Sequence, residues 1–204
     1  MRQKLQDSSV PVVAALLLTG LFGSAAAVRA QLIDTTPTIV GNAKAVQATA
    51  FGNTTVLADT GTLGGTSDAR EASQVTGGVP SVLAGEVLHA VTIGWPDQVA
   101  SEASIANLGL TVAGTTISAD LVIARALAAT GGAAMGNSGI DNLSVNGIPV
   151  YVTGEPNQTV WIPGGQVIVN EQKTSSTGIL VNGLRVVVTG VADIVIASAT
   201  AGIH

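Results

Sequence analysis

Short runs in which apolar and polar residues alternate recur along the chain, with Gly, Pro, Asn or Asp between them. Alternation with a period of two is typical of β-strands that bury one face. Runs of this kind span residues 43–51, 54–57, 87–93, 98–108, 110–112, 116–127, 140–145, 159–162, 166–170, 179–188 and 193–199. Because no clear helical pattern separates them, we expect residues 31–204 to form a single antiparallel β-sandwich, jelly-roll or immunoglobulin-like.

The run at 116–127 shows the alternation well, and we expect its apolar residues to share one face. These residues are Ile117, Ala119, Leu121, Ile123 and Leu127. The alanine-rich stretch 119–129 would also suit a helix. Its β-branched residues and its alternation favour a strand.

Turn signals divide the runs. Asn146-Gly147 lies between two alternating runs, which is the strongest short-range sign of a hairpin, and Asn182-Gly183 repeats the signal. Residues 60–80 are rich in Gly, Thr and Ser, so we expect a long surface loop there.

The first thirty residues have the order of a secretory signal. Arg2 and Lys4 precede an apolar run at 10–22, and small residues follow up to Ala30. The run is shorter than the roughly 20 residues of a spanning helix. We expect cleavage after Ala27 or Ala30, no stable membrane insertion afterwards, and an extracellular or cell-surface location, with the periplasm as the alternative.

The composition argues against several kinds of partner and of chemistry. The chain has 13 Asp and Glu against 8 Lys and Arg, a net charge of −5, and no basic stripe, so we expect no nucleic-acid partner. It has no cysteine, which excludes disulfides and thiol nucleophiles. With 47% hydrophobic and only 10% charged residues, the chain suits sheets that pack on each other.

A series of sheet and turn motifs in the second half resembles the choice-of-anchor P family of secreted bacterial proteins. The motifs are SIANL at 104–108, IDNLSVNG at 140–147, PNQTV at 156–160, VNEQ at 169–172, VNGLRV at 181–186 and VADIVIASA at 191–199. The resemblance implies an exported surface or matrix module and brings no catalytic residue with it. Residues 201–204 carry no sorting motif, so covalent anchoring is not expected.

Catalytic candidates are few. His89 lies in an alternating run, on the face that also carries Val87 and Val91, and His204 is the last residue. No Gly-x-Ser-x-Gly motif accompanies them. Carboxylates that could act in pairs are Asp68 with Glu71, and Glu86 with Asp97 or Glu102, but ordinary solvated positions explain each one.

A calcium site at Asp97 or Asp141 lacks a recognised loop pattern, and ordinary Asx turns are favoured. We therefore expect no enzymatic activity, no metal and no cofactor.

Two tryptophans precede turns that contain proline, at Trp95-Pro96 and Trp161-Ile162-Pro163. Together with Asp97 and Tyr151 they are the candidate ligand-binding residues, because aromatic rings stack on sugar faces. The alternative is that each tryptophan closes one end of the core.

Two functions remain. The first is a non-catalytic structural or adhesive module that associates with itself through an edge strand, for which the run at 193–199 is the candidate. The alternative is a module that binds a cell-surface polysaccharide or another envelope component, using loop 60–80 and the turns at Trp95 and Trp161.

Overall fold

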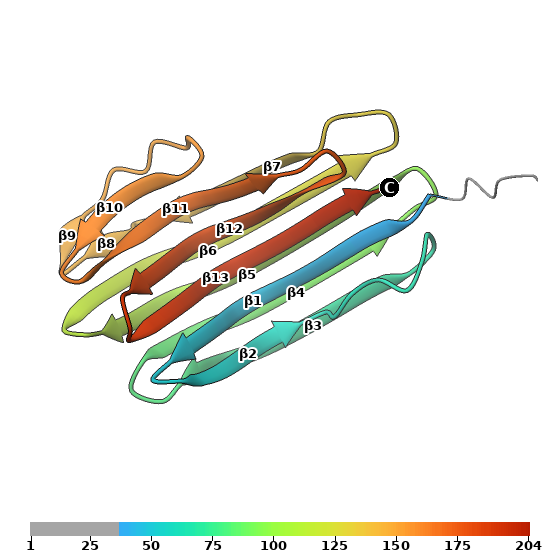
Figure 1. Ribbon diagram of the computed structural model, residues 1–204. Helices are drawn as coiled ribbons and strands as arrows, with labels where there is room; N and C mark the ends of the chain where they lie inside the picture. The colour runs from blue at the N-terminus through green and yellow to red at the C-terminus, as the bar shows by residue number, and fades with distance from the viewer. Residues whose placement is uncertain (1–36) are drawn as a thin grey trace, which may run out of the picture. The chain divides into compact units, whose positions relative to one another are not determined.

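The computed structural model describes residues 37–204, and the proposed signal at 1–30 lies outside them. All regular elements in this range are strands, as the alternation predicted (Figure 1). They are β1 (Ile39–Ala50), β2 (Asn53–Asp59), β3 (Ala69–Val79), β4 (Leu83–Gly94), β5 (Gln98–Val112), β6 (Thr115–Ala129), β7 (Met135–Asp141), β8 (Ser144–Val145), β9 (Ile148–Pro149), β10 (Gln158–Ile162), β11 (Gly165–Thr174), β12 (Gly178–Val188) and β13 (Ala192–Ile203).

The strands form two antiparallel sheets packed face to face, which confirms the predicted β-sandwich. Sheet A has the order β10-β11-β12-β13-β1-β2. Sheet B has the order β3-β4-β5-β6-β8-β9, and β7 also pairs with β6. In Figure 1 the strands of sheet A lie in front of those of sheet B.

Small and branched aliphatic side chains fill the space between the sheets. The largest side chains that are fully buried are Leu, Ile and Val residues from both sheets, such as Leu88, Ile105, Leu184 and Ile196. Many core positions are alanines, and a Cβ added to Gly41 would overlap Thr92 and Val99 of the facing sheet. The sheets therefore approach closely, as a core without aromatic residues allows.

A row of irregular residues crosses each sheet. In sheet A the row is formed by neighbouring residues of β11, β12, β13, β1 and β2, namely Asn170, Gly183, Ala197, Ala45 and Ala58. Asn170, Ala197 and Ala58 have φ angles of 53°, 53° and 47°, in the left-handed region. We call this row and its counterpart in sheet B, which includes Val87, Asn107 and Asn142, the seam.

The seam reverses which residues of a strand face the core. In β6, Ile117 and Ala119 point inward, but beyond Asp120 the buried residues are Val122 and Ala124. The prediction that residues 117–127 keep one face was therefore wrong. Leu121, Ile123 and Leu127 leave the buried set because the alternation shifts by one residue at the seam.

Two turn predictions fail and one is confirmed. Residues 60–80 are not one long loop, because β3 occupies 69–79 and pairs with β4 along its whole length. Asn182-Gly183 is not a turn but lies inside β12. Asn146-Gly147 does form the turn between β8 and β9, with φ angles of 52° and 75°.

The last strand is central rather than peripheral. Strand β13 pairs with β12 on one side and with β1 on the other, so the run at 193–199 has no free edge. Within residues 37–204 the outer strands are β10 and β2 in sheet A; in sheet B they are β3 on one side and β7 and β9 on the other. The prediction that the final run is an edge strand was wrong.

Candidate functional site

The predicted aromatic residues are all exposed at the surface. Trp95 and Asp97 are in the turn between β4 and β5, where the Trp95 N–H donates to the carbonyl of Gln98. Trp161 projects from β10 and is 78% exposed, and Tyr151 follows β9 and is 84% exposed. Exposure of this extent does not fit a role in closing the core for Trp161.

The two tryptophans do not lie together. The Trp95 turn lies at the end of the sandwich where β1 begins, since Gly94 is against Ile39. Trp161 pairs with Gln166 of β11. The register continues from there across β12 and β13 to Thr49, near the other end of β1. Strand β1 has 12 residues, so its ends are roughly 35 Å apart. Ligand binding by either tryptophan alone stays a prediction.

The predicted catalytic candidates have ordinary partners. His89 lies on the outer face of sheet B, 3.9 Å from a carboxylate oxygen of Glu71. Glu86 accepts a hydrogen bond from Asn107 at 2.8 Å, and Glu102 pairs with Arg125 at 2.6 Å. Among the residues that the structure describes, no three His, Cys, Asp or Glu side chains gather where they could hold a metal.

Asp68 is held in the loop before β3. Its carboxylate accepts hydrogen bonds from the Gly64 N–H at 2.7 Å and from Arg70 at 2.8 Å. The backbone bond from Gly64 is the main reason that the pKa of Asp68 is below its usual value, and the bond from Arg70 adds to it. These contacts make Asp68 a fixed anion that orders its loop.

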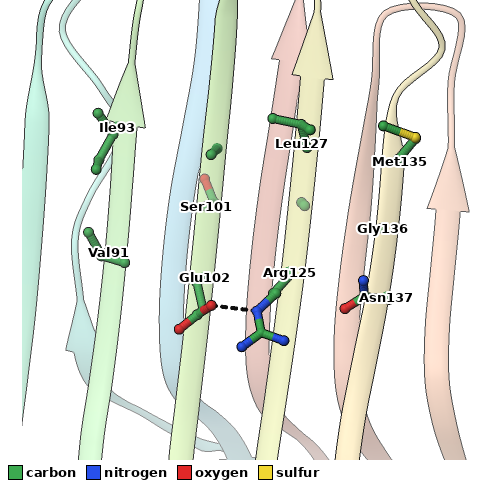
Figure 2. Close-up of a pocket in the computed structure, with 11 residues that line it drawn as sticks. Val91, Ile93, Ser101, Glu102, Arg125, Leu127, Met135, Gly136 and Asn137 are labelled. Carbon is green, nitrogen blue, oxygen red and sulfur yellow. Dashed lines mark hydrogen bonds and ion pairs between the residues drawn. The ribbon is translucent and has the colours of Figure 1, made fainter.

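A groove of about 580 Å³ runs over the outer face of sheet B (Figure 2). Its apolar part is formed by Val91, Ile93, Ala100, Leu127 and Met135, from β4, β5, β6 and β7. In Figure 2 the ion pair between Glu102 and Arg125 lies at the other end of the labelled set, away from Ile93, Leu127 and Met135. The alternation did not reveal this groove, because it predicted Leu127 on the same face as Ile117 and Ala119.

A second, polar groove of about 310 Å³ lies on the outer face of sheet A, and we call it the sheet A groove. It crosses β11, β12, β13 and β1. Its polar lining includes Asn42, Lys44, Lys173, Asn182, Ser198 and Thr200, and two apolar residues, Leu180 and Val195, belong to the same wall. None of these residues was a candidate at the sequence level, because their approach depends on which strands are neighbours.

An ion network forms part of the wall of the sheet A groove, which Arg185 and Asp193 also line. Arg185 donates to Asp193 at 2.7 and 2.9 Å and to Glu171 at 2.8 Å. Lys173 lies 3.1 Å from the same Glu171 oxygen, and Asn182 donates to the other one at 2.6 Å. The network therefore satisfies a carboxylate that is only 6% exposed.

The network keeps both carboxylates charged. Burial is the largest influence on Glu171 and opposes its ionisation, but the bonds from Asn182, Lys173 and Arg185 outweigh it and lower its pKa. The bond from Arg185 is the main reason that the pKa of Asp193 is lowered. The bond to Asp193 contributes most to the raised pKa of Arg185.

Asn182 has one unsatisfied atom. The residue is 4% exposed, its Nδ2 donates to Glu171, and its Oδ1 has no hydrogen-bond partner. An unpaired acceptor at such a depth costs roughly 1–3 kcal/mol. Buried polar atoms without a hydrogen-bond partner are rare in natural structures, so each one needs an explanation.

The edge formed by β3 carries a third surface feature. Val75 in β3 is 82% exposed and Val87 in β4, opposite to it, is 63% exposed. They line a shallow hollow together with Ser73, Gln74, Leu88 and His89. Val87 also has a φ of 48°, which is rare for a β-branched residue.

The fold and these surfaces define an all-β, two-sheet sandwich whose notable features are two grooves and an open edge. Comparison of the chain with protein-family models, with curated proteins and with solved structures finds no match. In residues 37–204 there is no helix of the length and apolarity needed to span a membrane.

Proposed function

We propose that the protein is an exported, non-catalytic structural module of the bacterial cell surface or matrix, and that its copies associate through strand β3. The signal-like N-terminus and the motifs that resemble those of the choice-of-anchor P family support export. The observation that carries the proposal of self-association is the open edge of β3.

Strand β3 is well suited to pairing with another strand. It has 11 residues, whereas the other outer strands β2, β7, β10 and β9 have 7, 7, 5 and 2. Within residues 37–204 it pairs with β4 only, so alternate N–H and C=O groups along its other side lack a strand partner.

The sequence of β3 lacks the usual protection of an edge. Residues 72–79, ASQVTGGV, contain neither a charged residue nor a proline. Natural proteins commonly use such residues to prevent strands of neighbouring molecules from pairing. The charged residues of β3, Arg70 and Glu71, lie near its first end.

Val75 and Val87 form an exposed apolar pair near the middle of β3. Two copies of β3 that pair antiparallel about a two-fold axis at Val75 place this residue against its own counterpart. Each Val75 side chain then packs beside its counterpart, and the two B sheets form one continuous sheet. Main-chain bonds supply affinity in this mode of association, and side-chain contacts supply the register.

A measurement of molar mass tests the proposal. Light scattering during size-exclusion chromatography, over a range of concentrations, is expected to show dimers or larger species of the exported protein. Val75→Lys is expected to shift the protein to monomers, because a charge on the edge opposes strand pairing.

Ile148→Lys is the matched control. Ile148 is also exposed, but it lies in β9 at the opposite edge of sheet B. This variant should associate like the wild type. A wild-type protein that is monomeric at all concentrations, or a Val75→Lys variant that associates as before, would contradict the proposal.

A further inference from the structure

The groove on the outer face of sheet B, which we call the sheet B groove, lies where a small residue separates two larger ones. Ile93, Ala100 and Leu127 are opposite one another in register on β4, β5 and β6. The strands are about 4.8 Å apart, so the short side chain of Ala100 leaves a hollow between its longer neighbours. Met135 of β7 continues the row and is 61% exposed. The volume of about 580 Å³ is within the range of small-molecule sites.

The next row of outward residues on the same strands is largely polar. In register it consists of Val91, Glu102, Arg125 and Asn137. Residues two positions apart on a strand are separated by about 7 Å, so the polar row runs beside the apolar row at this distance. The sheet B groove therefore has an apolar end and an end with an ion pair (Figure 2). A ligand that matches both ends is amphipathic.

Arg125 has donors that the protein does not use. Its Nε donates to Glu102 at 2.6 Å, and within residues 37–204 no hydrogen bond engages its two terminal nitrogens. A guanidinium group donates from all three of its nitrogens. The side chain is 53% exposed, so a ligand in the groove can reach the terminal nitrogens.

Arg185 shows that an arginine of this chain binds two carboxylates at once. It donates to Asp193 through Nε and Nη2 and to Glu171 through Nη1. Arg125 has one such partner, Glu102, and its terminal nitrogens are open to a second carboxylate from outside the chain. A cation at this position would be repelled by the guanidinium. Because Glu102 already balances one charge, a single carboxylate suits the site better than a dianion.

The apolar end of the sheet B groove fits an alkyl chain. Ile93 and Leu127 are aliphatic, and Met135 has a flexible side chain that adapts to different shapes. The lining contains no aromatic side chain, so it offers no ring on which a sugar or a nucleobase could stack. Methylene groups gain affinity when they leave water for such a surface.

We infer that the sheet B groove binds a medium-chain alkyl monocarboxylate. The alkyl chain lies over Ile93, Ala100 and Leu127, and the carboxylate accepts hydrogen bonds from the terminal nitrogens of Arg125. This inference does not depend on association through β3, because the groove is lined by β4, β5, β6 and β7.

A titration followed by NMR tests the inference on the exported protein at neutral pH. The probes are octanoate and, as its neutral counterpart, octanol. Octanoate should cause saturable shifts of the amide signals of the lining residues, and it should bind about fivefold or more tightly than octanol. Arg125→Met keeps an apolar side chain but removes the guanidinium. This variant should lose the preference for octanoate and bind octanol like the wild type.

Ala100→Leu tests the position of the alkyl chain. The larger side chain fills the hollow, so binding of octanoate should weaken about tenfold or more. Ser104→Leu is the matched control, because Ser104 is on the outer face of the same strand but opposite His89 and Ile123, outside the groove lining. This variant should bind octanoate like the wild type.

Three results would overturn the inference. The first is the absence of saturable shifts, or shifts confined to residues outside the sheet B groove. The second is an Ala100→Leu variant that binds octanoate as the wild type does. The third is a wild type that binds octanol as tightly as octanoate, or an Arg125→Met variant that keeps the preference for octanoate, because the guanidinium would then not hold a carboxylate.

The variant Val75→Lys separates the two proposals. It should bind octanoate with wild-type affinity while it fails to associate. Conversely, Ala100→Leu should associate normally while it binds octanoate weakly.

Discussion

Two arginines on outer sheet faces pair with carboxylates at different depths. Arg125 and Glu102 form an exposed pair on sheet B, with side chains 53% and 40% exposed. Arg185 meets Glu171, whose side chain is almost covered. An exposed pair contributes little, because solvent screens it and its side chains lose freedom. Removing one partner of a covered pair leaves a charge without compensation.

We therefore predict unequal effects of the same substitution at the two sites. Arg185→Met should lower the free energy of unfolding by about 3 kcal/mol, and Arg125→Met by less than about 1 kcal/mol. Urea-induced unfolding followed by circular dichroism measures both. Equal losses in the two variants would show that burial of Glu171 does not set the strength of its network.

The same network predicts how stability depends on pH. Folding lowers the pKa of Glu171 and Asp193, whose ordinary values are 4.5 and 3.8. Their contribution to stability is therefore fully present above about pH 4.5. It is lost as the pH falls through the lowered pKa values of the folded state, because protonation then breaks the bonds to Arg185.

The unfolding free energy of the wild type should fall between pH 5 and pH 3, and the double variant Glu171→Gln, Asp193→Asn should lose less over that interval. Ser198→Ala should keep the wild-type dependence. Asp68, whose pKa is also lowered, leaves some dependence in every variant. Parallel curves for the wild type and the double variant would contradict this account.

At the scale of the strands, the seam is the main departure from regular structure. It places Val87 in the left-handed region, although its side chain is largely exposed and gains little from packing within the chain. The left-handed conformation costs an L-residue about 1–2 kcal/mol of stability. Glycine avoids this cost, but its greater freedom in the unfolded chain lowers the stability of the folded state by about 0.5–1 kcal/mol.

Val87→Gly should therefore raise the free energy of unfolding, by up to about 1 kcal/mol. Val91→Gly, at a regular position of the same strand, should lower it. Both are made with Val75→Lys, so that association does not contribute to the denaturation curves. A Val87→Gly variant that loses as much stability as Val91→Gly would contradict the left-handed conformation at Val87.

The seam also explains where sequence reasoning succeeded and where it failed. Alternation identified most of the strands and the sandwich, because most positions on each side of the seam keep a period of two. It misplaced Leu127, since Asp120 and its neighbours carry no glycine or other sign that the pattern shifts there. It also missed β3, because Gly77-Gly78 resembles a turn but lies in a strand.

The sheet A groove was beyond sequence reasoning for a different reason. Glu171, Asn182 and Arg185 are separated along the chain and come together because β11 pairs with β12. Asn182-Gly183 had the composition of a turn, and its place within a strand follows from the pairing of β12 with neighbours on both sides. Only the order of strands in the sheet brings these side chains to one surface.

At the scale of the molecule, the sandwich presents different chemistry on different surfaces. The outer face of sheet A has a polar groove with balanced charges, and the outer face of sheet B has a largely apolar one. The edge at β3 is long and uncharged over residues 72–79. Copies of such a module can associate through the β3 edge. The central strands of both grooves then stay uncovered.

Disulfide trapping at the edge tests the central claim most directly. The chain has no cysteine, so a covalent dimer of a single-cysteine variant must join two introduced thiols. Residues directly opposite in an antiparallel pair have Cβ atoms about 4.5–5.5 Å apart, close to the separation that a disulfide needs. Mild oxidation of the Val75→Cys variant should give a disulfide-linked dimer much faster than oxidation of Ile148→Cys, and the dimer should keep the fold. If Val75→Cys forms dimers no faster than Ile148→Cys, β3 does not join copies of this protein about Val75.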